Sequence, residues 1–140
     1  MHQAVALIGE SNEALRELMR RALEGADYAV IESENAGQLE ATLRFRRVTS
    51  APRVLLVTSI TMFEGCSQML ATFTRWRAAL RRSVPHVLLT CEFGTLKYSA
   101  RPDLGRCLSA GILEKPFDLT LLQSIAYRYR MSSASASSLR

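Results

Sequence analysis

Residues 111–122 read Gly-Ile-Leu-Glu-Lys-Pro-Phe-Asp-Leu-Thr-Leu-Leu, and this stretch indicates how the rest of the chain folds. Ile112 and Leu113 form a short apolar run that predicts a strand. Asp118 is a good N-cap for a last helix, because its carboxylate can accept a bond from a free amide at the helix start. The apolar residues of that helix are Leu121, Leu122, Ile125 and Tyr129. The stretch therefore predicts a strand, a turn and a capped helix in succession.

The same alternation of apolar runs and helical patterns is found upstream. Further strands are predicted at residues 4–8, 28–31, 54–57 and 87–89, the last of them preceded by Pro85. Ser11 or Asn12 can cap the first helix, Asn35 a second helix that carries Leu39, Leu43 and Phe45, and a third helix follows Gly65. A fourth is expected between residues 92 and 105, where Pro102 must interrupt it or delay its start. Five such units predict a doubly wound α/β fold, a parallel sheet with helices on both faces.

Length and composition fit one globular domain. The chain has 140 residues, of which 48% are hydrophobic and 22% charged. No apolar run approaches the roughly 20 residues that span a bilayer, and the start lacks the charged region of a signal peptide. We expect a cytoplasmic domain over residues 1–131, without a membrane partner. Residues 132–140 are rich in serine and alanine, which predicts a flexible tail or linker.

The charge and the cysteines exclude several classes of function. The net charge is +5, but the arginines are scattered over the predicted helices, which is typical of solvated faces, so direct nucleic-acid binding is not expected. Cys66, Cys91 and Cys107 have no C-x-x-C spacing, and only His2 and His86 could join them, so we expect neither a metal nor a cofactor. No glycine-rich phosphate loop or nucleophile elbow is present, so we expect no catalytic residues and no enzyme.

Polar residues stand at the ends of the predicted strands, where function collects in this fold class. Glu10 and Ser11 follow the first strand, Val57 and Thr58 end the third, Thr90 ends the fourth and Lys115 ends the fifth. With the Lys-Pro-Phe turn and the five strand–helix units, residues 4–130 resemble the CheY-like, flavodoxin-like receiver domain of bacterial response regulators. This resemblance implies the strand order 2-1-3-4-5. It also implies a cis peptide bond between Lys115 and Pro116.

The same resemblance implies that some residues needed for phosphorylation are missing from this chain. In receivers an acidic pair after the first strand holds a divalent cation, an aspartate after the third accepts phosphate from a histidine kinase, and a threonine and a lysine bind the phosphoryl group. Here the pair maps onto Glu10 and Ser11, and the acceptor maps onto Val57 if Gly65 anchors the loop, or onto Thr58 if Pro52 does. The three aspartates, Asp27, Asp103 and Asp118, stand elsewhere. Thr90 and Lys115 match the family.

These residues predict a degenerate phosphorylation pocket. Lys115 either keeps its place in a switch or pairs with Glu10 across the pocket. Glu64 or Glu92 could replace the missing carboxylate ligand, but the sequence of their loops does not show which position either one takes. Cys91 could act as a redox sensor or be an inert buried thiol.

The function predicted from this pattern is a phosphorylation-independent pseudo-receiver that signals by protein contact. It would serve as the N-terminal regulatory domain of a transcription regulator or as a stand-alone adaptor. Tyr127, Arg128 and Tyr129 on the last helix are the predicted surface for a partner protein or a second copy. The alternative is a sensor of a small ligand, in which Phe73, Trp76 and the arginines of residues 72–77 bind a cyclic dinucleotide, unless the two aromatic rings belong to the core.

Overall fold

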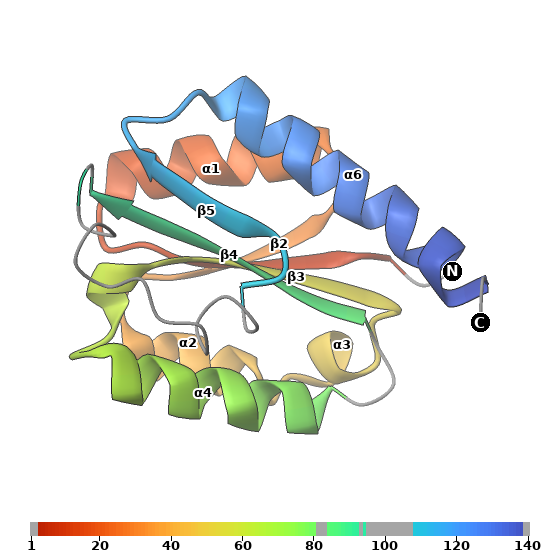
Figure 1. The fold of residues 1–140 in the computed structure, drawn as a ribbon, viewed down its shortest axis with the longest axis horizontal. Coiled ribbons are helices and arrows are strands. Elements are labelled where there is room, and N and C mark those ends of the chain that lie inside the picture. The colour runs from red at the N-terminus through yellow and green to blue at the C-terminus, as the bar shows by residue number, and fades with distance from the viewer. Residues whose placement is uncertain (1–2, 81–83, 93, 95–107, 139–140) are drawn as a thin grey trace.

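The computed structural model describes residues 3–80, 84–92, 94 and 108–138, which form a sheet between two layers of helices (Figure 1). The strands are β1 (Val5–Gly9), β2 (Ala29–Ser33), β3 (Arg53–Ser59), β4 (Val84–Glu92) and β5 (Gly111–Lys115). Every neighbouring pair is parallel and the order is β2-β1-β3-β4-β5, which confirms the prediction. The peptide bond between Lys115 and Pro116 is cis, also as predicted.

The helices divide between the two faces of the sheet (Figure 1). One face is covered by α1 (Glu13–Gly25) and α6 (Leu119–Ser138), and the other by α2 (Ala36–Thr42), α3 (Arg46–Thr49) and α4 (Cys66–Ala79). A single 3₁₀ turn, η1 (Ile60–Met62), follows β3. Among the described residues, no helix combines the length and the hydropathy needed to cross a membrane.

Each helical layer encloses its own hydrophobic core, because successive side chains of a strand point to opposite faces. On the α1/α6 side, Ile8, Val57 and Leu88 pack with Met19 and Leu122. The other core contains, among others, Leu7, Leu39, Leu56, Phe73, Trp76 and Leu89. Since both faces are covered, β1 is buried along its whole length, as expected for a central parallel strand.

The predicted caps are present. The Oδ1 atom of Asn12 accepts the Leu15 amide at 2.9 Å, and that of Asn35 accepts the Gln38 amide at the same distance. The carboxylate of Asp118 accepts the Thr120 amide at 2.8 Å. The first helix is therefore capped by Asn12 and not by Ser11, which is exposed.

Several boundaries differ from the prediction, and three of them have a clear physical reason. β2 extends to Ser33 because Glu32 and Ser33 pair with the end of β1, and backbone pairing does not require apolar side chains. β4 begins at Val84 and includes Pro85, which the first residues of a strand tolerate. Phe45 is not in the second helix: α2 ends at Thr42, and Phe45 is the N-cap of α3.

The serine- and alanine-rich stretch, for which we predict a flexible tail or linker, is helical as far as α6 extends, to Ser138. Residues 132–138 contain neither glycine nor proline, and alanine is the best helix former, so nothing in them ends the helix. The predicted fourth helix between residues 92 and 105 lies almost entirely outside the described residues.

Candidate functional site

The carboxyl ends of β1, β3, β4 and β5 bring four of the predicted residues to one face of the sheet. Val57 packs in the core on the α1/α6 side. Thr90 and Lys115 each stand two positions after a residue of that core, Leu88 and Leu113, and so face the same way. Glu10 joins them, because its Oε1 atom lies 2.9 Å from Nζ of Lys115.

Thr58 lies on the opposite face, which settles the open choice between the two positions at the end of β3. A Cβ atom added to Gly9 would come within 2.5 Å of Oγ1 of Thr58 and 3.2 Å of Leu39, a residue of the α2/α4 core. Thr58 therefore fills the space beside a glycine on β1. Val57, completely buried, lies on the face of Glu10 and Lys115 and has no nucleophilic atom in its side chain.

Glu10 is held by both of its carboxylate oxygens. Oε1 accepts Nζ of Lys115 at 2.9 Å, and Oε2 accepts the backbone amide of Asn12, also at 2.9 Å. The glutamate is only 2% exposed, and the side chain of Lys115 is 16% exposed. The interaction is thus a largely buried ion pair between the lysine ammonium and the glutamate carboxylate.

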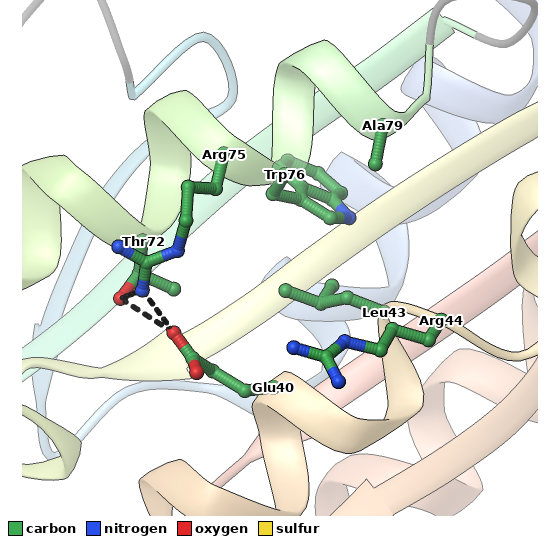
Figure 2. Close-up of a pocket in the computed structure, with 7 residues that line it drawn as sticks. All are labelled: Glu40, Leu43, Arg44, Thr72, Arg75, Trp76 and Ala79. Atoms are coloured by element: carbon green, nitrogen blue, oxygen red, sulfur yellow. Dashed lines mark hydrogen bonds and ion pairs between the residues drawn. The ribbon is translucent and has the colours of Figure 1, made fainter.

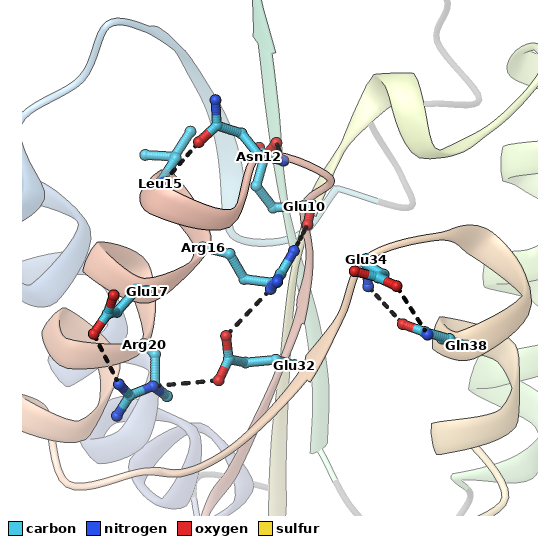
Figure 3. A network of polar contacts seen from close by, with 9 residues as sticks. All are labelled: Glu10, Asn12, Leu15, Arg16, Glu17, Arg20, Glu32, Glu34 and Gln38. Carbon is cyan, nitrogen blue, oxygen red and sulfur yellow. Dashed lines mark hydrogen bonds and ion pairs between the residues drawn. The ribbon is translucent and has the colours of Figure 1, made fainter.

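A network of ion pairs fixes the turn that carries Glu10 (Figure 3). Arg16 on α1 donates from Nη1 to the backbone oxygen of Glu10 at 2.9 Å, and its Nε lies 3.3 Å from Glu32 on β2. Arg20 also contacts Glu32, at 3.2 Å. Asn12 caps α1 in the same turn. The loop after β1 is therefore tied to both α1 and β2.

These residues do not fit the divalent cation that receivers bind. Mg²⁺ needs several oxygen ligands. Glu10 already uses both oxygens, Ser11 is exposed, and Val57 has no oxygen in its side chain. Within the described ranges, no three histidine, cysteine, aspartate or glutamate side chains lie close enough together to hold a metal ion.

Thr90 and Glu92 complete the surroundings of the lysine. Thr90 is fully buried, and its hydroxyl has no hydrogen-bond partner in the described part of the chain. Glu92, whose register the sequence left open, ends β4 with an oxygen 3.9 Å from Nζ of Lys115. An open cleft of about 340 Å³ lies alongside, lined by Leu15, Glu92, Lys115, Pro116 and Phe117.

Cys91 lies beside this site but is 1% exposed. Burial raises the pKa of its thiol, and the carboxylates of Glu114 and Glu92 raise it further, against a smaller opposite effect of Lys115. A thiol with a raised pKa is a poor nucleophile, so the structure favours the inert thiol over the redox sensor.

The aromatic residues proposed for a cyclic dinucleotide belong to the core. Phe73 is completely buried and Trp76 is 1% exposed. Neither ring offers a face on which a base can stack. Arg75 is exposed, but it is engaged by the carboxylate of Glu40. The interpretation of residues 72–77 as a stacking site for a dinucleotide is therefore wrong.

The predicted surface on α6 is only partly exposed. Tyr127 is 52% exposed, with the Arg130 guanidinium 5.5 Å from its ring centre, and Arg128 is exposed as well. Tyr129 instead faces inward: its hydroxyl donates to the backbone oxygen of Ser109 at 2.8 Å, and its ring lies 4.5 Å from that of His86. Tyr129 therefore anchors α6 to β4, and only Tyr127 and Arg128 remain available for a partner.

This anchor predicts a pH-dependent stability. Burial lowers the pKa of His86, whose Nδ1 lies 3.2 Å from Oγ of Ser109 and whose Nε2 is buried without a partner in the described residues. The unfolded chain therefore binds more protons below pH about 6.5, the ordinary pKa of histidine. We expect the His86 contribution to stability to be complete above this pH and to be lost as the pH falls toward the lower folded-state pKa.

Urea unfolding between pH 5 and pH 8 measures this effect. The variant His86→Gln cannot titrate at this position, so its unfolding free energy should fall less than that of the wild type as the pH drops below 6.5. The carboxylates titrate in both proteins and cancel in the difference. Equal pH dependence of the two proteins would show that His86 is not the group responsible.

Comparison with known proteins identifies the fold. No protein-family model matches the sequence, and no curated protein is similar to it. Solved structures are similar, and they include CheY-like receiver domains. The receiver domain from Methylobacillus flagellatus is 20% identical, with a TM-score of 0.62 over 89% of this chain and 99% of that one. The chemotaxis regulator CheY4 of Vibrio cholerae is 15% identical, with a TM-score of 0.68 over 91% and 98%. The response regulator StyR is 16% identical, with a TM-score of 0.71 over 99% of this chain and 64% of that one.

Proposed function

We propose, starting from the receiver fold, that this domain is a signalling module that works by protein contact, without phosphorylation and without catalysis of its own. The observation that carries the proposal is the occupied pocket. Val57 near the end of β3 is completely buried and has no nucleophilic atom, and Lys115 forms an ion pair with Glu10 at 2.9 Å.

The chemistry of phosphotransfer explains why this arrangement cannot perform it. The transfer needs a carboxylate to attack phosphorus and a cation to offset the charge on the transferring group. The aliphatic side chain of Val57 has no nucleophilic atom. The only carboxylate left at the predicted cation site, that of Glu10, already accepts Lys115 and the Asn12 amide. The two defects are independent, so no single substitution repairs both.

The internal ion pairs and the similar structures support a function through protein contact. The pocket is held in one arrangement by internal ion pairs, so the surface of the domain has a fixed shape for a partner to recognise. The similar structures include chains matched almost completely, such as CheY4, and a longer one, StyR, of which 64% is matched. Either arrangement, a stand-alone adaptor or the regulatory part of a transcription regulator, suits a module of this kind.

Incubation with acetyl phosphate and Mg²⁺ tests the proposal. We expect the intact mass to stay unchanged, while an ordinary receiver treated in parallel gains a phosphoryl group. The variant Val57→Asp should also remain unmodified, because Glu10 and Lys115 still occupy each other. A hydroxylamine-labile phosphate adduct on the wild-type chain would contradict the proposal.

A further inference from the structure

A second pocket lies between α2 and α4, on the opposite face of the sheet from the strand-end site (Figure 2). Its volume is about 120 Å³, and its wall consists of Glu40, Leu43, Arg44, Thr72, Arg75, Trp76 and Ala79. A recess of this size is large enough to admit a single side-chain group.

Two hydrogen-bond donors in this wall, one buried and one exposed, lack a protein partner among the described residues. Trp76 is 1% exposed, and its indole Nε1 makes no hydrogen bond within the described part of the chain. An indole N–H can only donate, so it requires an acceptor from elsewhere. The guanidinium of Arg44 is exposed and forms no ion pair with a described residue. Arg75, by contrast, is engaged by Glu40 and lies 3.4 Å from Oγ1 of Thr72 (Figure 2).

The chain beside the pocket is basic and partly apolar. Arg46 and Arg47 on α3 are exposed, and no acidic side chain among the described residues pairs with either. Phe45, between them and Arg44, is 42% exposed, although large apolar side chains usually avoid water. Aromatic residues and arginine are enriched in protein interfaces, and three guanidinium groups favour a partner that carries negative charge.

We propose that the pocket between α2 and α4 receives a carboxylate side chain from an acidic segment of a partner protein. The carboxylate would accept the indole N–H of Trp76 and pair with Arg44, while neighbouring acidic and apolar residues of the segment contact Arg46, Arg47 and Phe45. Arg44 is a long exposed side chain at the rim, so it can move to admit the group. This proposal does not depend on the loss of phosphorylation.

A nucleic acid fits these features less well. Glu40 forms part of the wall and opposes a polyanion, and a phosphodiester within a duplex backbone cannot enter a recess of about 120 Å³. A single carboxylate on a flexible side chain brings only one negative charge toward Glu40 and carries no duplex behind it. It supplies one acceptor for each of the two unpaired donors.

The only tryptophan of the chain provides the measurement, because the indole N–H gives a single signal in a proton–nitrogen NMR spectrum. The probes are a blocked peptide of four glutamates and two leucines, the same peptide with glutamines, free glutarate, and a short DNA duplex. We expect the glutamate peptide alone to shift the indole signal saturably. Arg44→Gln should weaken its binding about tenfold, and Glu40→Gln should strengthen it.

Arg21→Gln is the matched control, since it removes an exposed arginine from α1 on the other face of the sheet. Its binding should equal that of the wild type. Equal weakening by Arg44→Gln and Arg21→Gln would overturn the proposal, and so would a glutamine peptide that binds as tightly as the glutamate peptide. If glutarate bound as tightly as the peptide, the occupant of the pocket would be a small acid and not a protein segment. If the duplex bound more tightly than the peptide, the occupant would be a nucleic acid.

Discussion

Replacing Lys115 with methionine is expected to lower the free energy of unfolding by about 3 kcal/mol. The variant leaves the carboxylate of Glu10, 2% exposed, with the Asn12 amide but without its cationic partner. A buried charge that loses its partner keeps the full cost of leaving water, which is why such variants lose about 3–5 kcal/mol. The lower end applies because Lys115 is itself partly exposed. Urea unfolding followed by circular dichroism measures the loss.

Two further variants make this result specific. The double variant Glu10→Gln with Lys115→Met should recover most of the stability, since a neutral amide can still accept the Asn12 N–H and no buried charge remains. Arg21→Met removes a cation from an exposed pair, in which Arg21 is 67% and Glu17 is 51% exposed. It should cost less than about 1 kcal/mol. If Lys115→Met were as mild as Arg21→Met, the strand-end ion pair would not hold the pocket together.

Trp76→Ala is expected to have the largest effect on stability, a loss of about 4 kcal/mol. Trp76 is among the largest fully buried side chains, and its removal leaves a cavity between α4 and the sheet that α2 cannot fill without moving. Phe45→Ala is the control, because it also removes an aromatic ring but one that is 42% exposed. Its cost should stay near 1 kcal/mol.

Because Trp76 is the only tryptophan, unfolding of this pair is followed by far-ultraviolet circular dichroism and not by fluorescence. A loss of less than about 1 kcal/mol for Trp76→Ala would mean that the ring is not part of the core, and the interpretation as a stacking site would have to be reopened.

The sequence alone determined the architecture and the lack of an aspartate at the end of the third strand. Apolar runs that alternate with capped helical patterns predict a parallel sheet between two layers of helices, because that arrangement buries the strands on both faces. The Lys-Pro-Phe turn and Thr90 indicated the receiver-like order of the strands. The absence of an aspartate at the end of the third strand is a property of the sequence itself, whatever the fold.

Only the tertiary structure decided which side chains meet. The pairing register of β3 with β1 puts Val57 and not Thr58 on the face of Glu10 and Lys115, and in a strand a shift of one residue reverses the face. The inward position of Tyr129 depends on Ser109 and His86, which are far from it in sequence. The sequence also could not show that the indole N–H of Trp76 has no hydrogen-bond partner among the described residues. Periodicity indicates that a residue is buried, but not which of its atoms lacks a partner.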